Sequence, residues 1–134
     1  MSPMRILVVG AGGVGGAIAT AASRRAFFEH CTIADIDGAR AAAVAEGTGD
    51  ARFAGARVDA SDATSVSALA REIGATVIMN AADPRFVMPI FDAAFAADAD
   101  YLDMAMSLSQ RHPTEPFSRT GVMLGDEQFA KAAA

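Results

Sequence analysis

The glycine-rich stretch "GAGGVG", which opens at Gly10, has residues whose types and spacing could bind a phosphate group. Gly10, Gly12 and Gly15 follow the spacing G-x-G-x-x-G. In this pattern the first glycine permits a sharp turn, the second lets the backbone approach a pyrophosphate, and the third lets a helix pack closely. The free N–H groups and the positive dipole end of that helix would attract the phosphates without a lysine. Gly13 and Val14 complete the predicted phosphate-binding turn.

A second stretch, "ADID", contains Asp35, which stands twenty positions after Gly15. A carboxylate there accepts hydrogen bonds from the ribose hydroxyls of a dinucleotide, and it repels a 2′-phosphate unless an arginine compensates. Ile36 follows it in the predicted cofactor pocket, and Asp37 adds a second negative charge, so the sequence favours NAD over NADP. Arg40 lies one helical turn further on and could reach a phosphate. The alternative interpretation of Asp35 and Asp37 is a solvated turn that binds nothing.

Two further stretches, "VDASD" and "NAADPRF", follow predicted strands. Asp59 in the first either borders an adenine pocket or belongs to a simple turn. Asn80, Ala81 and Ala82 in the second are expected opposite the glycine turn, where small side chains leave room for a dinucleotide.

Along the chain, short strand-like runs alternate with helix-length stretches. We expect strands over residues 6–9, 32–35, 56–58, 76–79 and 100–102, and helices over residues 14–27, 39–45, 61–73 and 86–97 and from Asp126 onward. Ser61 is expected to cap the third helix, and Pro89 to break the fourth. Because a parallel crossover needs about a dozen residues, this alternation predicts parallel pairing. The fold class is therefore an α/β, doubly wound parallel sheet of the Rossmann type, with ligands at the carboxyl ends of its strands.

The composition is that of one globular domain of 134 residues, with 52% hydrophobic residues and a formal net charge of −5. The acidic balance argues against nucleic acid as a partner, and the glycines and charges interrupt any run long enough to span a membrane. Cys31 is the only cysteine, which excludes an internal disulfide and is compatible with a cytoplasmic location. His30 and His112 are isolated, so no metal site is expected.

An export signal is the other interpretation of the apolar opening "RILVVGAGGVGGAIATAA". Each glycine costs about 1 kcal/mol in the interior of a helix, and an export signal needs a continuous apolar helix. The five glycines in the stretch therefore favour a strand, a turn and a helix.

The order of these motifs resembles that of the saccharopine dehydrogenase family, a group of NAD(P)-dependent oxidoreductases. "VVGAGGVGGAIA", "ADID", "VDASD", "VIMNAADPRFVMPIFDAA" and "DYLDMA" follow one another as in the family's N-terminal half, so the resemblance covers essentially the whole chain. It implies that the glycine turn, Asp35 and residues 80–82 hold the dinucleotide. It also implies that Asp103 lies near the nicotinamide end of the cleft.

Enzymes of this family carry a further domain for substrate binding and dimerisation. This chain stops at "GDEQFAKAAA", which is typical of a helix without a stop signal. We therefore expect residues 1–134 to be the NAD(P)-binding N-terminal domain of a longer two-domain enzyme, which could form a homo-oligomer. Its substrate would be a small molecule with an amino-acid-like imine or amine carbon, reached through the second domain.

No residue is assigned a catalytic role from the sequence. Asp103, His112, Glu115 and Asp126 are the available acids and bases, and each also fits a structural or surface role. The alternative function is that of an NAD-sensing regulatory domain, such as that of potassium-transport regulators. "NAADPRF" and "DYLDMA" favour the dehydrogenase.

Overall fold

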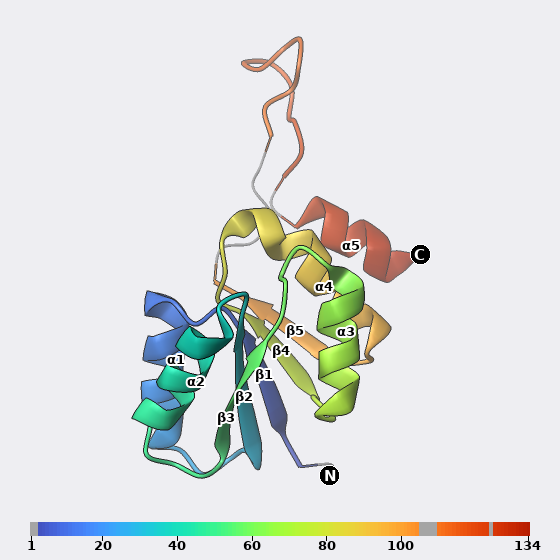
Figure 1. Cartoon of the computed structure of the whole chain (residues 1–134). Helices are drawn as coiled ribbons and strands as arrows, with labels where there is room; N and C mark the ends of the chain where they lie inside the picture. Colours follow the sequence, from blue (N-terminus) through green and yellow to red (C-terminus); the bar gives the residue numbers. More distant parts are fainter. Residues whose placement is uncertain (1–2, 105–109, 124) are drawn as a thin grey trace.

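The computed structural model describes residues 3–104, 110–123 and 125–134. Within these residues, five parallel strands form a single sheet in the order β3-β2-β1-β4-β5 (Figure 1). The strands are β1 (Arg5–Val9), β2 (His30–Asp35), β3 (Phe53–Arg57), β4 (Val77–Asn80) and β5 (Asp100–Asp103). The order reverses between β1 and β4, and such a switch point is where open α/β sheets bind ligands. The predicted Rossmann-type sheet is therefore confirmed.

Helices cover both faces of the sheet, as the doubly wound prediction requires. The helices are α1 (Gly13–Ser23), α2 (Gly38–Gly47), α3 (Ala63–Glu72), the short 3₁₀ helix η1 (Pro84–Phe86), α4 (Val87–Ala96) and α5 (Asp126–Ala133). In Figure 1, α1 and α2 lie on one side of the strands and α3 and α4 on the other. No helix in the described part of the chain is long and apolar enough to cross a bilayer.

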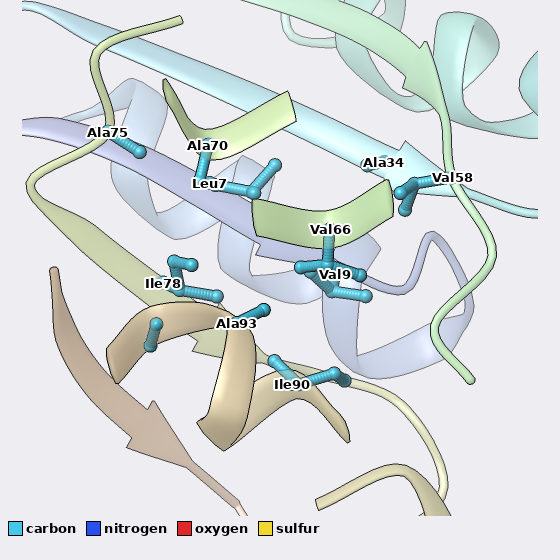
Figure 2. Packing of buried hydrophobic residues seen from close by; sticks show 11 residues of the cluster. Leu7, Val9, Ala34, Val58, Val66, Ala70, Ala75, Ile78, Ile90 and Ala93 are labelled. Atoms are coloured by element: carbon cyan, nitrogen blue, oxygen red, sulfur yellow. The ribbon is translucent and has the colours of Figure 1, made fainter. Parts of the chain in front are cut away.

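Alternate side chains of the central strands belong to two separate apolar clusters, one on each face of the sheet. Leu7 and Val9 of β1 point to the face covered by α3 and α4, where Val66 and Ile90 pack against them (Figure 2). Val8 points to the other face and joins the cluster formed with α1 and α2. Because side chains alternate along a strand, a strand covered on both faces is apolar throughout, as the run at 6–9 indicated.

Helix α1 ends at Ser23, four residues before the predicted end at residue 27. The chain leaves the helix because Phe28 is buried just before β2, where its ring meets that of Phe53 edge-on, with ring centroids 5.7 Å apart. Phe27, which the apolar pattern had placed in the helix, is 64% exposed. Packing between distant residues therefore overrides the local helical pattern.

Asp62 caps helix α3, and the predicted capping by Ser61 is wrong. The Asp62 carboxylate accepts hydrogen bonds from the backbone N–H groups of Thr64 and Ser65. The Ser61 hydroxyl donates instead to Asp59 at 2.6 Å. Both serine and aspartate favour the N-cap position, so composition alone could not separate these neighbours.

The predicted break at Pro89 is also wrong, since α4 continues through it to Ala96. Pro89 lies in the first turn, where the backbone N–H would have no partner within the helix. Of the predicted helix, Phe86 falls in the preceding η1, which Asp83 caps by accepting from the N–H of Arg85.

Residues 110–123 lie away from the sheet, and α5 follows them in the chain. Gln110 and Val122 pair in an antiparallel bridge at the base of an arm that projects from the body of the molecule (Figure 1). Helix α5 begins at Asp126, as predicted, and its Lys131 forms an ion pair with Asp92 of α4. The last residue of the "DYLDMA" motif, Ala105, lies outside the described residues.

Candidate functional site

The first glycine of the turn lies between the carboxyl ends of β1, β2 and β4. Gly10 has a φ of 113°, which side chains disfavour, and its N–H donates to the carbonyl of Ala34 at 2.7 Å. A methyl group on Gly10 would lie 2.7 Å from the carbonyl oxygen of Ala81. Gly10 is therefore required both by the backbone conformation and by the close approach of the chain after β4.

The other two glycines of the motif have opposite surroundings. A methyl group on Gly15 would lie 1.9 Å from the carbonyl oxygen of Gly10, so Gly15 allows α1 to pack directly on the turn. At Gly12 and at Gly13, a methyl group would meet no atom of the described residues within 4 Å. Packing within the protein therefore does not explain Gly12, whereas a ligand passing close to the backbone would.

The N-terminus of α1 carries no capping side chain. Gly12 is its N-cap, and within the described residues no acid stands in its first turn. The first N–H groups of a helix have no carbonyl of a preceding turn to bond, and they carry partial positive charge. At α2 and α3 these groups are bonded by Asp37 and Asp62. The N-terminus of α1 remains open to an anion.

Asp35, at the end of β2, is oriented by two backbone donors. One carboxylate oxygen accepts from the N–H of Ala11 at 2.8 Å, and the other accepts from the N–H of Asp37 at 2.9 Å. Partial burial raises the pKa of Asp35, but these two hydrogen bonds and the charge of Arg40 outweigh it and lower the pKa below its usual value. The predicted ribose-binding carboxylate is therefore ionised and fixed beside the glycine turn.

A cavity of about 220 Å³ opens beside this carboxylate at the carboxyl edge of the sheet. Five sequence-predicted site residues contribute to it, although they come from different parts of the chain. The lining residues are Val9, Gly10, Asp35, Ile36, Val58, Asp59, Ala60, Ala82 and Phe86. Asp59 lines the cavity and also holds its own turn, since the N–H and hydroxyl of Ser61 donate to it and lower the pKa of its carboxyl.

Arg57 is a charged neighbour of this cavity that the sequence interpretation missed. It ends β3 and lies in register with Asp35 on β2, and its Nε donates to the carbonyl of Ile36 at 3.1 Å. Arg40 lies 3.8 Å from the carboxylate of Asp37. Two arginines therefore lie near the two acids that were expected to exclude NADP. An arginine in the third predicted strand, residues 56–58, next to its last residue was the available signal, because parallel strands end at one edge of the sheet.

The segment after β4 lies against the glycine turn, as expected for residues 80–82. The N–H of Ala81 donates to the carbonyl of Val9 at 2.8 Å, and Ala82 lines the cavity. Asn80 is only 2% exposed, and its side-chain oxygen accepts from the N–H of Ala82 at 2.9 Å. Ala82 thus forms part of one wall of the cavity, and Ala81 lies beside it against the glycine turn. We call these two residues the 81–82 wall, which the buried side chain of Asn80 holds through the N–H of Ala82.

A family model described as the saccharopine dehydrogenase NADP binding domain matches residues 6–134. The chain belongs to the saccharopine dehydrogenase family. The resemblance inferred from the motifs is thereby confirmed, and a pyridine nucleotide is the ligand of the matched domain. The preference for NAD stays a prediction, since the model describes an NADP-binding domain.

Among curated proteins, this chain is similar to the carboxyaminopropylagmatine dehydrogenase of Synechocystis. It is 30% identical over 101 residues, which cover 75% of this chain and 25% of the relative. The chain therefore spans about a quarter of the length of that dehydrogenase.

Solved structures share the fold. The apo saccharopine dehydrogenase (L-Glu forming) of Saccharomyces cerevisiae aligns with a TM-score of 0.63 and 17% identity, over 75% of this chain and 21% of that protein. A short-chain dehydrogenase/reductase of Veillonella parvula in complex with NADP aligns with a TM-score of 0.62 and 13% identity, over 78% of this chain and 48% of that one. At these identities the likeness shows the fold alone.

The candidate acids and bases do not gather at the cavity of this family domain. The ring of His112 accepts from the N–H of Glu115 on the projecting arm, and Asp126 accepts from the N–H of Met123 beside α5. Asp103 ends β5 and accepts from the hydroxyl of Tyr101 at 2.9 Å. Among the described residues there is no cluster of three or more acids, histidines or cysteines that could hold a metal ion.

Proposed function

We propose that this chain binds a nicotinamide dinucleotide across the carboxyl edge of its sheet. The pyrophosphate would lie at the uncapped N-terminus of α1, and the adenosine in the cavity beside Asp35. The observation that carries the proposal is Gly12, which adjoins an open helix N-terminus and has free space where a side chain would be. These residues fit the dinucleotide implied by the family match.

In this proposal the bound nicotinamide supplies or accepts a hydride, as it does in other dehydrogenases. The chain's own contribution is to hold and orient the cofactor. The amides of Gly13 and Val14 would neutralise phosphate charge, while Asp35 would accept from the ribose hydroxyls. Ala81 and Ala82 would keep the path to the nicotinamide end free of side chains. The proposed substrate carries an amino-acid-like imine or amine carbon.

The choice between NAD and NADP depends on a balance of charges at the adenosine end. Asp35 and Asp37 repel a 2′-phosphate, and Arg57 and Arg40 would attract it. Asp35 has its carboxylate fixed beside the cavity by two N–H groups, whereas Arg57 is oriented toward the carbonyl of Ile36. We propose that the carboxylates dominate and that the chain prefers NAD.

Titration calorimetry of the chain with NADH and NADPH tests the proposal and the preference together. We expect tighter binding of NADH, and loss of the preference in Asp35→Ala, at a cost to NADH binding of about 1 to 3 kcal/mol. Arg57→Met should leave NADH binding unchanged and weaken NADPH binding further. Equal or tighter binding of NADPH by the unchanged chain would show that the arginines dominate, and binding of neither cofactor would refute the function.

We further propose that the substrate is held by residues outside this chain. Hydride transfer needs the two carbons about 3 to 3.5 Å apart in an enclosed site, and the acids that line the cavity, Asp35 and Asp59, belong to the proposed adenosine end. The absorbance of NADH mixed with the chain and saccharopine, lysine or candidate imines should therefore stay constant. Turnover that disappears in Asp103→Ala would show a complete substrate site within these residues.

A further inference from the structure

Three side chains of β4 and β5 form a continuous series of hydrogen bonds that leads to the cavity wall. We name Asn80, Tyr101 and Asp103 the polar triad. The hydroxyl of Tyr101 donates to a carboxylate oxygen of Asp103 at 2.9 Å, and Nδ2 of Asn80 donates to the hydroxyl oxygen of Tyr101 at 3.1 Å. The side-chain oxygen of Asn80 then accepts from the N–H of Ala82, which lines the cavity.

Only one orientation of the Asn80 amide satisfies every group in this series. A carboxylate can only accept, so the single proton of the Tyr101 hydroxyl must point toward Asp103. The hydroxyl oxygen is then left as an acceptor, and Asn80 must present its NH₂ group to it. The amide oxygen of Asn80 consequently faces the N–H of Ala82. The polar triad thus fixes the direction of an amide that could otherwise be reversed.

The surroundings leave the Asn80 amide few alternatives to this arrangement. Asn80 is 2% exposed, so water cannot readily replace a lost partner. The ring of Tyr101 is held edge-on against Phe91, with ring centroids 5.3 Å apart, which keeps its hydroxyl in place. Reversal of the amide would turn its NH₂ group toward the N–H of Ala82 and remove the bond that supports the wall.

On the side that faces the glycine turn, the 81–82 wall has little room to move. The carbonyl oxygen of Ala81 is 2.7 Å from the position that a side-chain carbon on Gly10 would occupy, so the wall lies directly on the glycine turn. A shift of residues 81–82 would therefore change the space between the turn and the cavity, where the dinucleotide is proposed to lie.

We propose that Tyr101 is a positioning residue for the dinucleotide site, acting through the orientation of Asn80 on the 81–82 wall. Tyr101 itself does not line the cavity beside Asp35. The inference rests on the proposed function, because its consequence is a change in dinucleotide affinity. It extends the proposed cofactor site to β5.

The test compares Tyr101→Phe with Thr76→Val in the whole chain. Both changes remove one hydroxyl, but Thr76 lies at the opposite end of β4, where its hydroxyl accepts from the N–H of Arg5. We expect Tyr101→Phe to weaken NADH binding by about 3- to 10-fold, the scale of one hydrogen bond, with Thr76→Val within about twofold of the unchanged chain. Equal effects of the two variants, or none from Tyr101→Phe, would overturn the proposal.

A positioning role also predicts that the effect passes through Asn80. In an Asn80→Ala background, Tyr101→Phe should weaken NADH binding by less than about twofold, because residues that act as one unit are not additive. A purely structural role of Tyr101 would give the same loss in both backgrounds.

Amide hydrogen exchange supplies a measurement that needs no cofactor. The N–H of Ala82 should exchange faster in Tyr101→Phe than in Thr76→Val at equal global stability. If the unchanged chain bound neither dinucleotide, the proposed function would fail, yet this measurement would still test the polar triad. Unchanged exchange at Ala82 in Tyr101→Phe would refute the inference by itself.

Discussion

Charged and aromatic side chains close the amino edge of the sheet, whereas glycines and alanines keep its carboxyl edge open. At the amino edge, the Arg52 guanidinium donates to Asp50, to the carbonyl of Arg25 and to that of Ser23. It also lies 4.2 Å from the centre of the Phe28 ring. One arginine thus connects the end of α1 to the starts of β2 and β3.

At the carboxyl edge, the corresponding connections are made by the backbone. The N–H of Gly10 bonds to Ala34 and that of Ala81 bonds to Val9, so the glycine turn is held without large side chains. The comparison indicates that side chains connect the elements where the strands begin. Where the strands end, the backbone makes the connections and the N-terminus of α1 has no side-chain cap. Changes at the two edges should therefore separate folding from binding.

The largest effect is expected at the closed edge. Phe28→Ala removes a buried ring that packs edge-on against Phe53, and it should lower the free energy of unfolding by about 3 to 5 kcal/mol. Urea unfolding measures this loss. In conditions where the variant is folded, NADH affinity should stay within about twofold of the unchanged chain. A folded variant that binds NADH much more weakly would break the division between the edges.

A large effect on binding is expected at the open edge. Gly12→Val places a branched side chain in the proposed path of the pyrophosphate and should weaken NADH binding by at least about 100-fold, which corresponds to about 2.7 kcal/mol. Circular dichroism should show a largely unchanged fold. Gly47→Val is the matched control, because Gly47 also has open space around it and ends α2. Comparable NADH affinity in Gly12→Val would refute the cofactor site.

The smallest effect is expected on the stability of α3, whose N-terminus is capped by the side chain of Asp62. Hydrogen bonds from the hydroxyl and N–H of Ser65 and from the N–H of Thr64 lower the pKa of Asp62 below its usual value of 3.8. Because the pKa is depressed on folding, the stabilisation is fully present above about pH 4 and is lost as the pH falls through the folded-state value. Asp62→Asn keeps the cap but does not titrate.

The stability difference between the unchanged chain and Asp62→Asn should therefore be largest near pH 6 and shrink toward pH 2. Urea unfolding across this range measures it, and a difference independent of pH would contradict the argument. In this comparison Asp62 provides for α3 the negative charge that the dinucleotide phosphates would provide for α1.

The parts of the molecule that the sequence predicted correctly are those determined over short distances. The turn at Gly10, the strand before it and Asp35 after the second strand follow from the spacing of a single β-α-β unit. The strand alternation was enough to predict the sheet and its parallel pairing. The roles proposed for Gly12, Asp35 and Asn80 in cofactor binding stay predictions.

The missed features depend on residues far apart in the sequence. The early end of α1 follows from the packing of Phe28 on Phe53, and the position of Arg57 beside Ile36 follows from the pairing of β2 with β3. The hydrogen bond between Asn80 and Tyr101 joins residues 21 positions apart. Periodicity cannot identify such partners, because it shows which face a residue occupies and not which residue lies opposite.

The single cysteine allows local opening at the closed edge of the sheet to be followed over time. Cys31 lies in the second position of β2 with no exposed surface, and burial raises the pKa of its thiol to about 12 against the opposing charge of Arg52. The thiolate is the nucleophile that attacks a reagent such as iodoacetamide, so Cys31 can react only after the packing around it opens. When reclosing is faster than the reaction, the alkylation rate reports the equilibrium population of the opened state. The chain therefore contains its own probe of local opening around Cys31, with no label to introduce.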